Sequence, residues 1–208
     1  MLRTLQRFFL FVILRDAKII VVSGTCFFTF FTACSGKKNN APSTNNSTQT
    51  ENVFPVTDFL KGQLRILDSM GVTPLKIISA NGKTDSVWLK REDIRKNATP
   101  FLQPVIDSAN MYALFSEKSF LDQTINAFTF SYDPKNRLPD SIKLTHWDVY
   151  MDPQTNSIAR IYLVKENADT TSQLTWLVNK WYSIRTIIQL PNGQPQIKEE
   201  KIIWDFDD

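Results

Sequence analysis

The second half of the chain alternates short segments rich in aromatic and β-branched residues with dense turn signals, and this pattern limits the fold more than any other feature. Segments of this kind favour strands, and short loops join antiparallel neighbours. Turn signals include Asp133-Pro134, Asp152-Pro153 and Pro191-Asn192-Gly193. The sequence therefore predicts a five-strand antiparallel meander, with strands over 127–132, 141–151, 158–165, 173–190 and 197–206.

A helix is expected at the start of the folded region. Pro55-Val56-Thr57 opens it, Thr57 or Asp58 can cap it, and Gly71 is a natural stop. Apolar residues recur every three or four positions, which is the pattern of an amphipathic helix. The positions in this pattern are Phe59, Ile66 and Met70, in a series that also includes the polar Gln63, with Leu60, Leu64 and Leu67 beside them.

A hairpin and further helices follow. Asn81-Gly82 tolerates positive φ and predicts a tight turn between strands over 75–80 and 84–90. Residues 91–96 predict a short helix, and Thr99-Pro100 predicts the start of a second amphipathic helix that continues to Tyr112.

These elements predict one α+β domain in which the helices cover one side of a mainly antiparallel sheet. Their order is similar to that of the cone-shaped nuclear-transport-factor-2-like (NTF2-like) proteins. That resemblance implies a curved sheet around a ligand cavity, although a fold alone does not establish an activity. Both cysteines, Cys26 and Cys34, precede the domain, so it has no disulfide and depends on its apolar core.

The first part of the chain has the features of an export signal. An uncharged apolar run from Ile19 to Ala33 follows Lys18, and a polar segment from Ser35 to Asn52 comes after it. The run is shorter than the roughly 20 apolar residues of a spanning helix. A positive flank, a short apolar stretch and small residues near its end are typical of a secretory signal.

Phe31-Thr32-Ala33-Cys34 resembles the lipobox of bacterial lipoproteins. The resemblance implies that Cys34 carries acyl chains such as palmitate and that the signal peptide is removed before it. More than one acyl chain would anchor the protein firmly in a membrane. Ser35 in place of Asp favours the outer membrane, and the lack of an acidic cluster after Cys34 favours the periplasmic side.

The expected organisation is a signal peptide over 1–33, a lipidated cysteine and disordered tether over 34–52, and a single domain over 53–208. The tether has too little apolar surface to offset the entropy of ordering. Four basic residues and one acidic residue precede Cys34, which leaves 20 of each sign in the rest of the chain. The basic balance thus belongs to the signal and gives no indication of nucleic-acid binding.

His146 is the only histidine, and with Asp148 and Tyr150 it alternates along one face of a predicted strand. His146 and Asp148 could form an acid–base pair there. A partly buried histidine in a strand is the simpler interpretation. One histidine and no cysteine in the domain argue against the usual zinc sites, and no cofactor motif is present.

Five tryptophans, Trp88, Trp147, Trp176, Trp181 and Trp204, fall in predicted strands. Most are expected in the core. Trp181 is the exception, because it falls on the face opposite Trp176 and beside Arg185, where a flat ring could stack on a sugar or an apolar ligand.

Asp-Ser or Asp-Thr triplets occur more often than composition predicts, and they resemble the acceptor motif of a bacterial O-glycosylation system for envelope proteins. Turns and caps also favour these dipeptides. The hydroxyls that would be modified are those of Ser69, Ser86, Ser108, Ser141 and Thr170.

Two functions fit these observations. The first is a membrane-anchored envelope lipoprotein whose non-catalytic domain binds a protein or cell-wall partner. The second is a small-ligand or enzymatic domain with an NTF2-like cavity. An apolar cavity with polar groups near His146 would favour the second, and a filled core with exposed aromatic residues would favour the first.

Overall fold

The computed structural model describes residues 54–107 and 110–206. The predicted signal peptide, Cys34, the tether and Ser108 lie outside these residues. The described residues belong to one compact unit. None of the helices in the described part of the chain is long and apolar enough to cross a membrane.

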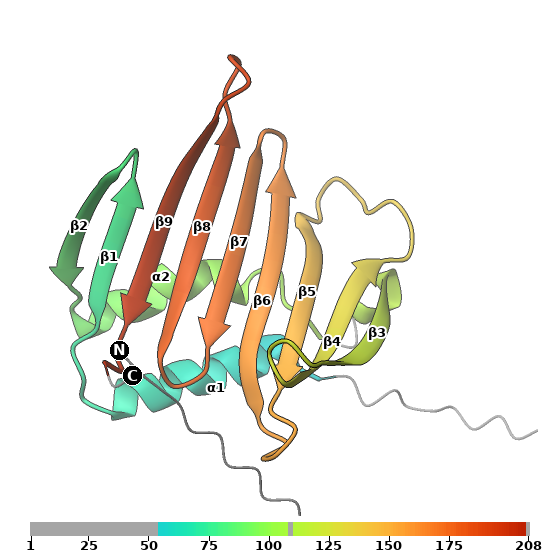
Figure 1. Cartoon of the computed structure of the whole chain (residues 1–208), viewed down its shortest axis with the longest axis horizontal. Coiled ribbons are helices and arrows are strands. Elements are labelled where there is room, and N and C mark those ends of the chain that lie inside the picture. Colours follow the sequence, from blue (N-terminus) through green and yellow to red (C-terminus); the bar gives the residue numbers. More distant parts are fainter. Residues whose placement is uncertain (1–53, 108–109, 207–208) are drawn as a thin grey trace, which may run out of the picture. The chain divides into compact units, whose positions relative to one another are not determined.

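The described residues form a nine-stranded sheet in which all neighbouring strands are antiparallel, with two α-helices (Figure 1). The strand order is β2-β1-β9-β8-β7-β6-β5-β4-β3. The elements in chain order are α1 (Val56–Ser69), β1 (Leu75–Ala80), β2 (Lys83–Trp88), α2 (Arg91–Leu102), a 3₁₀ turn η1 (Tyr112–Leu114), β3 (Phe115–Asp122), β4 (Ala127–Pro134), β5 (Leu144–Met151), β6 (Ile158–Asn167), β7 (Thr170–Leu177), β8 (Trp181–Gln189) and β9 (Pro195–Ile203).

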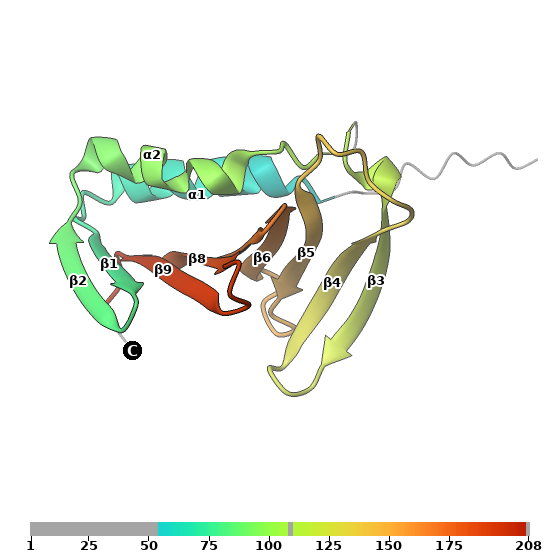
Figure 2. The same cartoon turned by 90° about the horizontal axis from the view of Figure 1, so that it is seen from above.

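Both helices lie across the same face of the sheet (Figure 2). The hydrophobic core fills the space between them and that face, and its largest fully buried side chains are Trp147, Trp176 and Tyr182. Phe101 of α2 packs edge-on against Trp176 and Tyr182, at 5.3 Å between ring centroids in each case. The α+β class and the antiparallel sheet agree with the sequence analysis.

The predicted hairpin is confirmed. Asn81 and Gly82 have φ angles of 51° and 74°, as a two-residue turn of this type requires. The last strand, β9, then pairs with β1 in an antiparallel register that sets Leu75 opposite Ile203. This pairing joins the hairpin to the meander across almost the whole domain sequence.

The predicted five-strand meander was wrong in two places, and seven strands run from β3 to β9. The expected single strand over 173–190 is two strands, because the chain turns at Val178-Asn179-Lys180, where Asn179 takes a φ of 64°. β3 was not predicted at all. Its sequence mixes charged and apolar residues without strict alternation, and most of it is exposed at the sheet edge.

The helix predictions also need correction. Residues 91–96 and Thr99-Pro100 belong to one helix, α2, in which Pro100 lies in the last turn and not at the start. The helix ends at the extended Gln103 and does not continue to Tyr112. In α1, the buried stripe is Leu60, Leu64 and Leu67, whereas Ile66 and Met70 are about half exposed.

Candidate functional site

The face of the sheet opposite the helices is the candidate functional surface, and we call it the open face. Side chains alternate between the two faces of a strand, so residues next to buried core positions point to the open face. Trp147, Leu163, Leu174 and Ile184 follow one another across the sheet on the helix side. The open face therefore carries His146, Asp148 and Tyr150 of β5, Arg160 and Tyr162 of β6, Trp181, Ser183 and Arg185 of β8, and Lys201 of β9.

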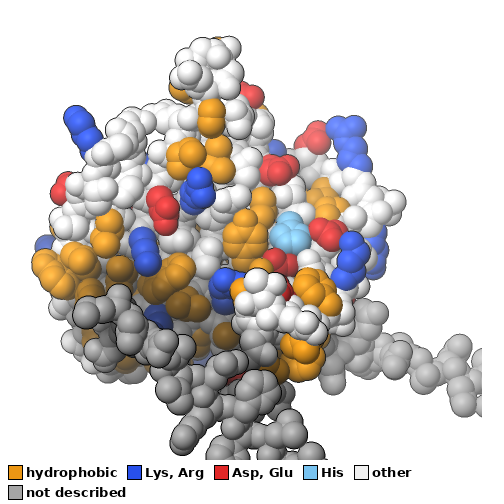
Figure 3. Space-filling view, viewed as in Figure 1, with side chains coloured by type: hydrophobic (Ala, Val, Ile, Leu, Met, Phe, Trp, Pro, Cys, Tyr) orange, Lys and Arg blue, Asp and Glu red, His pale blue; other side chains and the backbone are white. Residues whose placement is uncertain are grey.

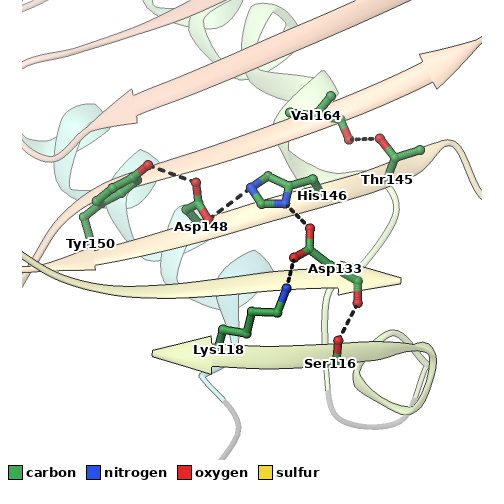
Figure 4. Close-up of polar contacts among 8 residues, drawn as sticks. All are labelled: Ser116, Lys118, Asp133, Thr145, His146, Asp148, Tyr150 and Val164. Atoms are coloured by element: carbon green, nitrogen blue, oxygen red, sulfur yellow. Dashed lines mark hydrogen bonds and ion pairs between the residues drawn. The ribbon is translucent and has the colours of Figure 1, made fainter. Parts of the chain in front are cut away.

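His146 lies between two carboxylates on the open face (Figure 4). Its Nε2 is 3.1 Å from Oδ1 of Asp148, and its Nδ1 is 2.9 Å from Oδ1 of Asp133. The Tyr150 hydroxyl donates to the other Asp148 oxygen at 2.9 Å, and Lys118 Nζ lies 3.2 Å from Asp133 Oδ2. The result is a continuous chain of polar contacts across β3, β4 and β5.

The carboxylates favour the protonated imidazole. The hydrogen bond with Asp148, supported by the one with Asp133, raises the pKa of His146 despite the opposing effect of burial. Burial disfavours ionised Asp148, but hydrogen bonds from His146, Ser131 and Tyr150 outweigh it and lower the pKa of this carboxyl. The hydrogen bond from His146 lowers the pKa of Asp133 as well. The raised pKa of His146 and the lowered pKa values of the two carboxyls favour an ion cluster in which an imidazolium joins two carboxylates.

This arrangement suits structure better than acid–base chemistry. A general base needs a ring nitrogen free to face a substrate proton. Both nitrogens of His146 are already engaged by carboxylates. No group of three or more His, Cys, Asp or Glu side chains placed to hold a metal occurs among residues 54–107 and 110–206.

The centre of the open face carries cations instead. Arg160 lies over the Tyr150 ring, with Cζ 3.9 Å from the centroid, and Lys201 Nζ lies 4.3 Å from the centroid of Trp181. Arg185 is exposed and stands across from Glu199 in the β8–β9 register, but the two form no ion pair. Among the described residues, none of these three cations has a carboxylate partner within 4.0 Å.

Figure 3 shows the open face with the histidine and its neighbouring acids to the right, Lys and Arg side chains near the centre, and hydrophobic side chains to the left. The register places Leu75, Trp88, Trp181 and Ile203 in one row across β1, β2, β8 and β9. Phe206 extends this row, 6.1 Å from Trp88 between ring centroids. The open face thus combines an apolar region, a cationic centre and the ion cluster of His146.

The sequence predicted the positions of some of these residues correctly and missed others. Trp181 points away from Trp176, as predicted, and Trp147, Trp176 and Trp204 are in the core. Trp88 is exposed. Asp133 was recognised only as part of a turn signal, yet β4 extends through it and brings its side chain to His146. The alternation of side chains along β4, continued to Asp133, was the signal that could have identified it.

The hydroxyls of the Asp-Ser and Asp-Thr triplets do not gather at one place. Ser69 ends α1 and donates to the Ile66 carbonyl at 2.6 Å, Ser86 lies on β2, and Ser141 lies between β4 and β5. These three are exposed, while Thr170 at the start of β7 is partly buried. Their glycosylation stays a prediction.

A pocket of about 420 Å³ lies on the helix side of the sheet, near the start of α1. It is mostly apolar, with one polar pair in which the Tyr132 hydroxyl donates to Glu117 Oε2 at 2.7 Å. His146 does not line it, because that side chain points to the open face. The pocket is lined by Phe54, Pro55, Glu117, Phe130, Tyr132, Val149, Met151 and Ile158.

No family model matches this chain, and no curated protein or solved structure is similar enough to match it.

Proposed function

We propose that the protein is a lipid-anchored envelope lipoprotein whose domain is a non-catalytic binding module, and that the open face is its binding surface. The signal over 1–33 would export the chain, and a lipid on Cys34 would hold it at the outer membrane, facing the periplasm. The lipobox resemblance supports this location. The open face supports the binding role.

The cationic centre of the open face is the observation that carries this proposal. Arg160, Arg185 and Lys201 stand on the face of the sheet that the helices leave uncovered, and they lack carboxylate partners within the described residues. An acidic binding partner would supply negative charges to these three cations. Complementary charge also speeds and orients association. The row containing Trp88 and Trp181 offers apolar contact beside them. The partner is therefore an acidic segment of an envelope protein or an anionic cell-wall polymer.

Binding to two soluble polyanions tests the charge requirement. The chain from Ser35 to Asp208 is titrated with poly-L-glutamate and with polygalacturonate, and neutral dextran serves as the ligand control. The triple variant R160Q/R185Q/K201Q is expected to lose at least about tenfold in affinity for whichever polyanion binds. Binding is also expected to weaken as salt rises, because salt screens exposed charges.

A matched variant separates this surface from net charge. K83Q/K96Q/R137Q removes three cations as well, all of them exposed and away from the open face, and we expect less than a twofold change. Equal losses in the two triple variants, or no binding of the parent chain to either polyanion, would contradict the proposal.

The membrane address has its own test. In a bacterial host that lipidates such proteins, the full chain is expected in the membrane fraction, with a mass increase on Cys34 that matches acylation. Cys34→Ser is expected to abolish that mass increase. An unmodified Cys34 in the parent chain would refute the anchor and leave the binding role of the open face untouched.

The pocket near α1 supports a second candidate, a small-ligand domain with an NTF2-like cavity. Its Glu117 carboxylate at an apolar wall suits an amphiphile with a cationic head group. Dodecyltrimethylammonium below its micelle concentration would then raise the melting temperature, dodecyl sulfate would not, and Glu117→Gln would remove the difference. Equal effects of the two detergents would exclude this candidate.

A further inference from the structure

The turn between β3 and β4 gathers large exposed hydrophobic side chains. We call residues 119–128 the β3–β4 tip, with the sequence SFLDQTINAF. Phe120, Leu121, Ile125 and Phe128 are 51, 45, 45 and 40% exposed. Asp122 is the only charged residue in the tip. Exposed apolar groups in this density indicate a contact surface.

The hydrophobic side chains point in several directions from the tip. Leu121 and Phe128 stand opposite each other in the β3–β4 register and share one face of the hairpin. Phe120 precedes Leu121 in the strand and therefore points to the other face. Ile125 lies in the turn itself, where the Asp122 carboxylate accepts the Thr124 N–H at 2.9 Å. The tip is thus apolar on both faces and at its end.

The tip also projects from the domain. In Figure 2 the β3–β4 turn is the part of the sheet that lies farthest from the helices. From the Phe120–Thr129 pair to the end of the turn the hairpin measures roughly 10 Å, at about 3.3 Å per strand residue. Interfacial segments enter a bilayer to a depth of about 5–10 Å.

From this geometry we propose that the β3–β4 tip inserts into the interface of a lipid bilayer. A flat protein surface would cover one face of the hairpin and leave the other apolar face in water. A bilayer surrounds the tip on all sides, so Phe120, Leu121, Ile125 and Phe128 leave water together. Lys118, one position beyond this set on the Phe120 face and largely exposed, would then stand at the level of the head groups.

This contact is independent of the lipid proposed for Cys34 and of the cationic centre of the open face. Flotation of the chain from Ser35 to Asp208 with vesicles tests it without an acyl chain. The buried hydrophobic cluster of the described residues lies between Val56 and Trp204, so this chain retains it. The vesicles are pure phosphatidylcholine, or phosphatidylcholine and phosphatidylglycerol at three to one. We expect the chain to float with both, because the driving force is apolar.

The variant F120S/I125S removes two of the exposed side chains and is expected to reduce partitioning at least about tenfold, since each large apolar group contributes substantially. I188S/I197S is the matched control. Ile188 and Ile197 are also exposed hydrophobic residues, but they lie on β8 and β9. Unchanged circular dichroism and melting temperature in both variants confirm that the fold is intact.

A fluorescent label provides a second readout that needs no loss of function. Cys26 and Cys34 are the only cysteines, so the chain from Ser35 has none. Ile125→Cys labelled with an environment-sensitive dye is expected to shift to the blue with phosphatidylcholine vesicles, and Gln194→Cys in the β8–β9 turn is expected to show no shift.

Three results would overturn the proposal. They are failure of the parent chain to float with either vesicle, equal losses for F120S/I125S and I188S/I197S, and a dimer that depends on the tip in sedimentation without vesicle binding.

Discussion

At the scale of single residues, the ion cluster of His146 predicts how stability depends on pH. The raised pKa of His146 means that folding favours the protonated ring. This contribution is complete below the unfolded pKa of about 6.5 and is lost as pH rises through the higher folded value. Asp133 and Asp148 have lowered pKa values, so their contribution is present above about pH 4 and is lost as pH falls through the folded values.

Replacing His146 tests this dependence. His146→Gln is expected to cost about 2 kcal/mol near pH 5.5, because hydrogen bonds to charged groups contribute about 1.5–3 kcal/mol and Asp148 is largely buried. The cost is expected to shrink as pH rises through the folded pKa of His146, where the parent imidazole loses its charge. Urea unfolding at pH 5.5, 7 and 9 measures both values. A cost that stays constant over this range would show that the charge of His146 contributes nothing.

The sequence alone predicts only the part of this cluster that lies on β5. His146, Asp148 and Tyr150 share a strand, and period-two alternation places them together without knowledge of the fold. Asp133 comes from another strand, so its contact with His146 depends on the β4–β5 register. That register is set by core packing around Trp147, Val149 and Tyr132, which no short sequence pattern specifies.

At the scale of elements, α1 shows how burial differs along one amphipathic helix. Leu64→Ala is expected to cost about 2–5 kcal/mol, since Leu64 is 1% exposed and its removal leaves a cavity. Ile66→Ala is expected to cost less than about 1 kcal/mol, because that side chain is about half in water. Denaturant unfolding of both variants measures the difference. Similar costs at the two positions would mean that α1 packs through another face.

Two glycines offer a contrast between turn and helix. Gly82 has a φ of 74° in the β1–β2 turn, so Gly82→Ala is expected to cost about 1–2 kcal/mol. Gly62 lies inside α1 with open space where a Cβ would stand, so Gly62→Ala is expected to stabilise by about 0.5–1 kcal/mol. Thermal unfolding distinguishes them by the sign of the change. Two changes of the same sign would disprove the assigned backbone conformations.

Local signals explain which elements could be predicted. Asn81-Gly82 defines its hairpin, and the spacing of Leu60, Leu64 and Leu67 defines α1. The β7–β8 turn has only Asn179 as a signal between strand-forming residues, so the sequence predicts a continuous strand there. Thr99-Pro100 predicts the start of a helix, although Pro100 lies near the end of one. In both places tertiary packing overrides the local preference.

At the scale of the whole molecule, the β1–β9 pairing decides whether the hairpin and the meander unfold together. Their strands are distant in sequence, yet Ile202 of β9 is fully buried in the shared core and stands opposite Lys76 of β1. Nζ of Lys76 donates to Oδ1 of Asn97 in α2 at 2.7 Å and lies 2.5 Å from Oε2 of Glu200 in β9. A sheet whose two parts are joined by such contacts is expected to unfold as one cooperative unit.

Hydrogen exchange on Ile202→Ala tests that expectation. The substitution is expected to cost about 2–5 kcal/mol by removing buried methyl groups. If the domain is one cooperative unit, the exchange free energies of slow amides in β1 and in β6 fall by the same amount, because both are released only by global unfolding. A fall confined to β1 and β9, with β6 unchanged, would show that the hairpin unfolds on its own. The long-range pairing would then be an attachment to an independently stable seven-strand meander.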